Sequence, residues 1–400
     1  MQFAERLNNV ETSAIRELFK LLGKPGIISF AGGFPDSAMF DVAGIRAATE
    51  AALTEEAGGA LQYGATEGYQ PLREQLAALM SAKGVTGVAP TDLLVTTGSQ
   101  QALDLLGKTM ISPGDKVIVE GPTFLATIQC FRLYGAEVIS APIDDHGVDV
   151  EQLEKLIAEH KPKLVYLIPT FGNPSGATLS LERRRKVLEL AVKYQTLVVE
   201  DDPYGDLYFD AAPPPSLLAL SFEVPGSREW LAHCGSLSKV LSPGLRIGWL
   251  VAPAELRDRA VMCKQFSDAH TSTFAQATAA QYLRAGHMPA TLAKVRAVYA
   301  ERARAMGAAL QRELGDAVSF VAPQGGLFLW VKLTGARGQL QDANVLAQRA
   351  IAQGVAFVPG APFFAQNPDV STFRLSFATA DVAKIEDGIA RLGQALRAQA

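Results

Sequence analysis

The chain has 400 residues and, at roughly 150 residues per domain, is long enough for two to three domains with sizeable cores. Apolar residues make up 48%, charged residues make up 20%, and the formal net charge is −4. This composition excludes a largely disordered chain, and it provides no basic excess for non-specific binding to nucleic acid.

Three cysteines, Cys130, Cys234 and Cys263, lie far apart in the sequence. They form no C-x-x-C pair, and neither they nor the five histidines have the spacing of metal ligands. We therefore expect core thiols in a reducing cytosol, without a metal site or a disulfide framework. The N-terminus carries charges where a signal peptide is apolar, and we find no membrane span. These features predict a cytoplasmic protein.

Short apolar runs alternate with helical stretches between residues 90 and 255. The expected strands are 93–97, 116–120, 163–170, 196–202 and 245–252. Continuous apolar runs are typical of strands that are buried on both faces. With helices between them, they predict an α/β fold built on a doubly wound, mostly parallel sheet. Ligand chemistry is then expected in the loops at the strand ends.

The character of the sequence changes after residue 288. Apolar residues from Leu292 to Leu314 keep a helical spacing, and Gly315 is the expected C-terminal stop. Short strands are expected next, mixed with helices in an α+β arrangement, at 319–333, 355–360 and 372–377. We predict three parts: an N-terminal segment that joins the small domain (1–44), a large domain (45–288) and a small C-terminal domain (289–400).

The most informative segment surrounds Lys239. Ser236 and Ser238 precede this lysine by three residues and by one, and Arg246 follows it by seven. An amine nucleophile beside hydroxyl and guanidinium groups suits a carbonyl ligand that carries a phosphate. The alternative is a surface lysine in a serine-rich turn. Ser-x-x-Lys also occurs in serine acyl-enzymes, but the Ser-Asp-Asn and Lys-Thr-Gly motifs that accompany it there do not occur in this sequence.

Two further motifs follow expected strands. Ser99, Gln100 and Gln101 open an apolar-periodic helix, whose free N–H groups and dipole suit a phosphate. Alternatively, Ser99 is only the N-cap of that helix. Asp201 ends a buried strand, where an unpaired carboxylate is costly, so we expect it to have a cationic or donor partner. Asp202 competes for this role and is otherwise a solvated turn carboxylate.

Five motifs occur in order along the chain: LVTTGSQQALDL, PTFGNPSG, VEDDPYGDL, SLSK and FRLSF. Together they resemble the class I/II aminotransferases, enzymes of the aspartate-aminotransferase fold that use pyridoxal 5′-phosphate (PLP). SQQALD, GGFPD and EDDPYG are most similar to one branch of that family. It contains the kynurenine/α-aminoadipate aminotransferases, the bacterial 2-aminoadipate aminotransferases and the aminotransferase-like half of MocR regulators. The resemblance makes 45–288 the PLP-binding domain.

The resemblance implies a contact with the cofactor for each matched residue. Lys239 binds PLP covalently and then moves a proton at the substrate Cα. Asp201 keeps the ring nitrogen protonated, and Tyr204 and Asn173 bind the 3-oxygen of the ring. Phe124 stacks on the ring where relatives commonly have tyrosine, although an aromatic residue after a strand is usually core. The implied phosphate ligands are Ser99, Gln100, Ser236, Ser238, Arg246 and Tyr63 of the partner subunit.

The implied substrate contacts come from both ends of the chain. Arg374 resembles the arginine that holds the substrate α-carboxylate by a two-point contact, and a buried structural ion pair is its alternative. Gly33 belongs to a loop whose backbone meets that carboxylate, together with Asn173. Arg16 matches a segment that covers the substrate side chain, although a lone arginine on an exposed helix is usually solvated.

The resemblance implies a homodimeric aminotransferase with shared active sites. It would move an α-amino group from an L-amino acid to a 2-oxo acid, such as 2-oxoglutarate, by ping-pong kinetics. One alternative is a PLP-dependent lyase or decarboxylase on the same scaffold. Another is a MocR-like ligand-sensing regulator, which needs a winged-helix module before this part. Because the family-like segment begins almost at Met1 and the net charge is −4, we expect no binding to nucleic acid.

Overall fold

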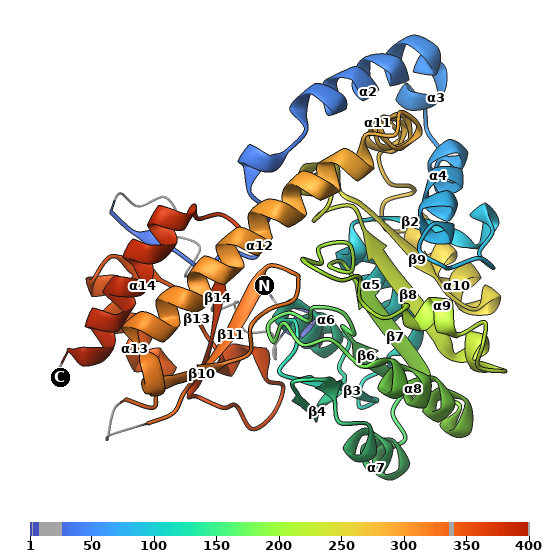
Figure 1. Ribbon diagram of the computed structural model, residues 1–400. Coiled ribbons are helices and arrows are strands. Elements are labelled where there is room, and N and C mark those ends of the chain that lie inside the picture. Colours follow the sequence, from blue (N-terminus) through green and yellow to red (C-terminus); the bar gives the residue numbers. More distant parts are fainter. Residues whose placement is uncertain (2, 8–25, 336–339, 399–400) are drawn as a thin grey trace.

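The large sheet of the molecule has eight strands in the order β2-β9-β8-β7-β6-β3-β4-β5. The computed structural model describes residues 1, 3–7, 26–335 and 340–398 (Figure 1). The strands of this sheet are β2 Leu93–Thr97, β3 Lys116–Gly121, β4 Glu137–Asp144, β5 Gly147–Val148, β6 Leu164–Leu167, β7 Leu197–Asp202, β8 Leu231–Ser236 and β9 Ile247–Val251.

The sheet is parallel from β8 to β4, whereas β9 runs antiparallel to both β2 and β8, and β5 runs antiparallel to β4. Every residue of β6 and β9 is buried, as their apolar runs predict. Helices pack against both faces of the sheet (Figure 1). The expected doubly wound, mostly parallel sheet is therefore confirmed. Strands β4 and β8 were not predicted because polar residues such as Ser140 and His233 interrupt their apolar pattern.

The helices between residues 42 and 284 are α2 Val42–Glu55, α3 Ala57–Leu61, α4 Gln70–Ser81, α5 Ser99–Met110, α6 Leu125–Leu133, α7 Val150–His160, α8 Leu181–Tyr194, α9 Leu217–Leu220, α10 Ala254–Gln265 and α11 Thr273–Arg284. Further along the chain lie α12 Met288–Glu313, α13 Ala343–Ala352 and α14 Val382–Arg397. The long helix predicted after residue 288 is α12, and Gly315 follows it with a φ of +53°. A positive φ is easiest for glycine, so the helix ends there.

A second sheet has four antiparallel strands in the order β10-β11-β14-β13. Its strands are β10 Val318–Phe320, β11 Phe328–Leu333, β13 Val358–Pro359 and β14 Thr372–Ser376. Near the N-terminus, β1 (Ile28–Ser29) pairs in parallel with β12 (Val355–Ala356). Helices α12, α13 and α14 gather beside this sheet (Figure 1), which gives the expected α+β arrangement. The domain boundaries at residues 44 and 288 stay a prediction.

Two hydrogen bonds bring the second sheet and the N-terminal segment to the loops of the large sheet. The Lys239 Nζ atom, after β8, donates to the carbonyl oxygen of Gly33 at 3.0 Å. Arg374 in β14 donates from Nη1 to Asn173 Oδ1, in the loop after β6, at 2.7 Å. These bonds join residues that lie 206 and 201 positions apart, and they enclose the candidate site.

Candidate active site

A cavity of about 410 Å³ lies where loops of the large sheet meet β14 and the segment after β1. The predicted site residues that line it are Gly33, Ser99, Gln100, Phe124, Asn173, Asp201, Tyr204, Ser236, Ser238, Lys239, Arg246 and Arg374. Tyr63 does not line this cavity, and Arg16 lies outside the described residues. A larger cavity of about 810 Å³ lies beside β11 and the β4–β5 hairpin. None of the predicted site residues that the structure describes line that larger cavity.

Asp201 offers one unpaired oxygen to the cavity. Its Oδ2 atom accepts a 2.6 Å hydrogen bond from the Tyr166 hydroxyl, whereas its Oδ1 atom is buried without a hydrogen-bond partner. Burial raises the pKa of Asp201 to about 6, and the Tyr166 hydrogen bond opposes that rise. A buried orphan acceptor is costly unless a ligand satisfies it. The ring nitrogen of a pyridinium, which carries an N–H, fits this atom.

Tyr166 was missed by the sequence analysis. It lies in β6 within an apolar run, where a tyrosine has the pattern of an ordinary core residue. Tyr166 pairs with Val199 of β7, two residues before Asp201. Side chains two positions apart on a strand share a face, so the register places the hydroxyl beside the carboxylate. This register was the signal that could have found Tyr166.

Asp202 is held by its own turn. Its Oδ1 atom accepts a 3.0 Å hydrogen bond from the backbone N–H of Gly205, and it does not line the cavity. Because Asp202 follows Asp201 in β7, its side chain points to the opposite face of the strand. Asp202 is thus a turn carboxylate, as the alternative interpretation expected, but it is half-buried rather than solvated.

Lys239 is half-buried directly after β8, and its amine is bound to the Gly33 carbonyl. Burial and, to a smaller extent, the nearby positive charges of Arg374 and Arg246 lower the pKa of Lys239 to about 8. A lowered pKa makes the neutral amine, which is the nucleophilic form, available near neutral pH. Gly33 thus contacts Lys239 through its backbone, and the expected contact of its loop with a substrate carboxylate stays a prediction.

The turn between β2 and α5 has the geometry of an anion site. Gly98, with a φ of +76°, is the N-cap of α5, and no side chain caps the helix. Ser99 is therefore the first helical residue, and the alternative N-cap role for it is wrong. Arg246 donates from Nη2 to the Thr97 carbonyl at 3.2 Å, and Ser238 N–H donates to Ser236 Oγ at 3.1 Å. Free N–H groups at a helix start, two serines and a guanidinium suit a phosphate.

Arg374 is a buried cation whose head group faces the same cavity. Its Nη2 atom donates to the Ala31 carbonyl at 2.9 Å, and its Nε atom has no partner. The guanidinium lies over the rings of Phe328 and Phe363, 4.2 and 4.9 Å from their centroids. Burial lowers the pKa of Arg374 to about 10. Within the described ranges no carboxylate forms an ion pair with it, so the structural ion pair considered as its alternative is not found there.

Three more of the predicted site residues, Tyr204, Asn173 and Phe124, line the remaining walls of the cavity. Tyr204 is buried after β7 and packs edge-on against Phe328, with 5.9 Å between the ring centroids. Asn173 is buried, and its side-chain oxygen is bound to Arg374. Phe124 is half-buried and directly precedes α6. Tyr63 is 87% exposed, and its ring lies 5.8 Å from that of His270.

These groups fit a phosphorylated pyridine aldehyde. An amine with a lowered pKa, a buried carboxylate oxygen without a partner and an anion-binding turn line one cavity. The described residues contain no cluster of three or more His, Cys, Asp or Glu side chains that could hold a metal ion. No helix in the described part of the chain is long and apolar enough to cross a membrane.

Comparison with known proteins identifies the family. Residues 27–392 match the model of aminotransferase class I and II, so the chain belongs to this family. It is 42% identical over 397 residues to the 2-aminoadipate transaminase of Thermus thermophilus, covering 99% of this chain and 96% of the relative. It is 31% identical over 421 residues to the mitochondrial kynurenine/alpha-aminoadipate aminotransferase of Bos taurus, covering 96% of each chain.

A solved structure agrees with these relatives. The alpha-aminoadipate aminotransferase of Thermus thermophilus, complexed with N-(5′-phosphopyridoxyl)-L-leucine, matches with a TM-score of 0.90 at 40% identity. The match covers 99% of this chain and 97% of that one. The protein is therefore an aminotransferase of the kynurenine/α-aminoadipate and 2-aminoadipate branch, and its cofactor is PLP.

Proposed function

We propose that the enzyme moves the α-amino group of an L-amino acid to a 2-oxo acid such as 2-oxoglutarate by a ping-pong mechanism. The observation that carries this proposal is the buried Arg374, whose Nε atom has no partner, beside the cavity of Lys239. Amino acids and 2-oxo acids share an α-carboxylate, which a fixed guanidinium binds at two points. One arginine can therefore hold the donor and the acceptor in turn.

Each polar group of the cavity has a role in this proposal. Bound PLP supplies an electron sink for the negative charge at the substrate Cα. Lys239 binds the cofactor covalently and moves the proton at Cα as general base and acid. Asp201 keeps the ring nitrogen protonated through its free Oδ1, and Tyr204 and Asn173 bind the 3-oxygen. The groups proposed to bind the phosphate are Ser99, Gln100, Ser236, Ser238 and Arg246.

The remaining predicted contacts belong to the same proposal. Phe124 stacks on the cofactor ring, and its position before α6 at the edge of the cavity supports this role. Gly33 closes the carboxylate end of the site, where an added Cβ would lie 3.1 Å from the Phe328 ring and 3.7 Å from Arg374. Arg16, which lies outside the described residues, would contact the substrate side chain.

We propose that the enzyme is a homodimer with shared active sites. Three large apolar side chains are exposed around α3 and the start of α11: Leu61 at 69%, Tyr63 at 87% and Phe274 at 39%. The two segments lie side by side (Figure 1), and Thr273 binds the Ala60 and Gln62 carbonyls. Large exposed apolar side chains gathered on neighbouring segments are typical of an association site. A second copy covering it would bring Tyr63 of the partner subunit toward the phosphate.

The proposed setting is amino-acid metabolism, with a biosynthetic role, in the cytoplasm. The three cysteines are free thiols, which fits a reducing compartment. In the buried Cys234, desolvation raises the pKa of the thiol well above its ordinary value. This thiol is therefore an inert core group rather than a reactive one.

A panel of amino donors tests the proposal. The holoenzyme is mixed with 2-oxoglutarate and one L-amino acid, and glutamate formation is followed; 2-aminoadipate, kynurenine, leucine and phenylalanine form the first set. We expect equimolar glutamate and donor-derived 2-oxo acid, with parallel double-reciprocal lines. Release of carbon dioxide or ammonia in place of glutamate would instead establish the lyase or decarboxylase alternative.

A further inference from the structure

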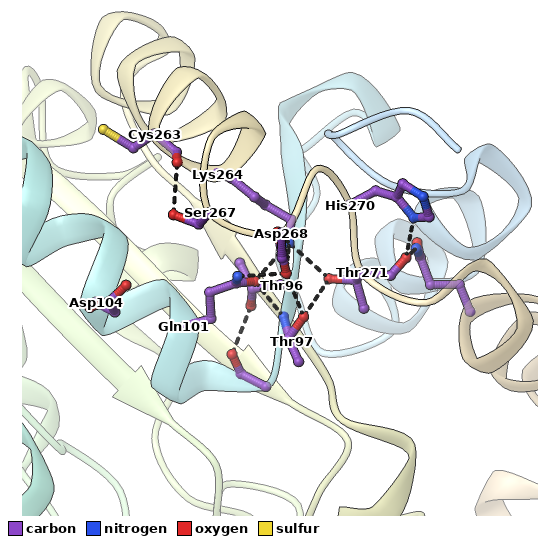
Figure 2. A network of polar contacts seen from close by, with 12 residues as sticks. Thr96, Thr97, Gln101, Asp104, Cys263, Lys264, Ser267, Asp268, His270 and Thr271 are labelled. Carbon is purple, nitrogen blue, oxygen red and sulfur yellow. Dashed lines mark hydrogen bonds and ion pairs between the residues drawn. The ribbon is translucent and has the colours of Figure 1, made fainter. Parts of the chain in front are cut away.

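A buried lysine outside the cavity lies behind the turn that is proposed to bind the phosphate. Lys264 is in α10, and its side chain has no exposed surface. Its Nζ atom donates to Gln101 Oε1 at 2.7 Å, to the two carboxylate oxygens of Asp268 at 2.8 and 2.9 Å, and to Thr271 Oγ1 at 3.1 Å. Figure 2 shows these residues converging with Thr97. We call the five the Lys264 network.

The network binds the turn on both sides of Gly98. Gln101 Oε1 also accepts from the Thr97 backbone N–H at 2.8 Å, and Gln101 Nε2 donates to Asp268 Oδ2 at 2.7 Å. Thr97 Oγ1 donates to the same carboxylate oxygen at 3.0 Å. The last residue of β2 and the first turn of α5 are therefore tied to one ion pair in α10 and the turn after it.

The same bonds extend to Arg246. The carbonyl of Thr97, whose N–H is bound by Gln101, accepts the 3.2 Å hydrogen bond from Arg246 Nη2. An added Cβ on Gly98 would collide with the Arg246 guanidinium, so the turn and this side chain are closely packed. A shift of the Thr97 peptide would move the helix start and the guanidinium together.

Stability alone does not explain a charge at this place. The Lys264 side chain has no exposed surface, whereas that of Asp268 is 30% exposed. Removing the ammonium from water costs several kcal/mol, and an ion pair with a partly exposed carboxylate returns at most about that much. A buried pair is better attested as a device that fixes one geometry among several. In this protein the geometry that it fixes is the turn at Ser99 and Gln100.

We propose that Lys264 is a positioning residue for the phosphate of PLP. With Asp268, it clamps Gln101 and Thr97 so that the Ser99 and Gln100 N–H groups and the Arg246 guanidinium are preorganised for a dianion. This inference rests on the proposed phosphate site. It predicts an effect on binding that depends on the phosphate group of the cofactor and is absent when that group is absent.

The test compares PLP with pyridoxal, which lacks the phosphate. Both are titrated into apoenzyme, and each Kd is measured by absorbance. Lys264→Met should weaken PLP binding about tenfold or more, as expected for loss of a hydrogen bond to a charged group, and leave the Kd of pyridoxal within about twofold. The matched control is Lys108→Met on α5, which removes a more exposed lysine bound to Asp104 at 2.7 Å. The control should alter neither Kd.

Two more variants keep the outcomes distinct. Gln101→Met removes the link to Thr97 without leaving Lys264 and Asp268 unpaired. If Lys264→Met does not fold, the Kd values of Gln101→Met for PLP and pyridoxal test the positioning role of the network instead. Equal weakening of PLP and pyridoxal, or no weakening of either, would overturn the inference. Arg246→Gln tests the phosphate site itself. If that variant leaves the Kd of PLP unchanged, the phosphate binds elsewhere; if it weakens PLP while Gln101→Met does not, only the role of the network is refuted.

Discussion

The hydrogen bond from Tyr166 to Asp201 can be removed with little change in packing. Tyr166→Phe deletes the hydroxyl that donates to Asp201 Oδ2 and keeps the ring, which packs edge-on against Phe131 at 6.1 Å. In this variant, Asp201 Oδ2 loses its hydrogen-bond donor, and Oδ1 already lacks one. Because the hydroxyl stabilises the ionised form, its loss raises the pKa of Asp201.

The size of the effect follows from the position of Asp201. A hydrogen bond to a charged group contributes about 1.5–3 kcal/mol, and about 2 kcal/mol changes the ratio of ionised to protonated carboxyl about thirtyfold. Burial already raises the pKa of Asp201 to about 6, so in the variant the protonated form should prevail at neutral pH. A protonated carboxyl cannot keep a ring nitrogen protonated. The ionised fraction of Asp201 at pH 7 then falls about fourfold, so we expect the half-reaction at pH 7 to slow about fourfold and to recover at higher pH, where Asp201 ionises.

The assay is a single-turnover half-reaction with one amino acid and no acceptor, followed by the absorbance of the cofactor at several pH values. Tyr134→Phe is the matched control, because Tyr134 also donates to an aspartate, Asp104, at 2.5 Å. That pair joins α5 and α6 and does not line the cavity. A rate and pH profile equal to those of the unaltered enzyme would refute the reasoning. A loss that is the same at every pH would point to packing instead of ionisation.

Three other outcomes are expected. Covalent capture of PLP by the apoenzyme should accelerate as the pH rises and level off above about 8, because burial lowers the pKa of Lys239; a midpoint near the ordinary 10.5 would contradict this. Asp201→Asn should retain PLP but slow the half-reaction about a hundredfold or more, and Asp202→Asn should slow it less; the reverse order would exchange their roles. Arg374→Lys keeps the charge but loses the two-point contact, so kcat/KM should fall by about 2 kcal/mol or more for every donor, and an unchanged value would place the carboxylate elsewhere.

The sequence by itself determined the features that depend only on residues close together in the chain. Two-sided burial of a strand needs a continuous apolar run, so β2, β3, β6, β7 and β9 could be predicted from their residues alone. The helix α12 follows from its 3.6-residue spacing and from the glycine after it. The residues around Lys239 and Asp201 could be named because they stand in short motifs that resemble those of a known family. The interrupted strands β4 and β8 lacked such a pattern.

The tertiary structure alone decided which polar groups are partners. Tyr166 and Asp201 are 35 positions apart, Lys264 and Gln101 are 163 apart, and Arg374 and Asn173 are 201 apart. A pattern of residue types reports burial and periodicity, but the partner of a buried hydroxyl or ammonium depends on strand register and helix packing across the whole chain. Likewise, only the direction of each side chain shows that Asp201 lines the cavity and Asp202 does not. Hydrogen bonding acts over about 3 Å in space, whatever the distance along the sequence.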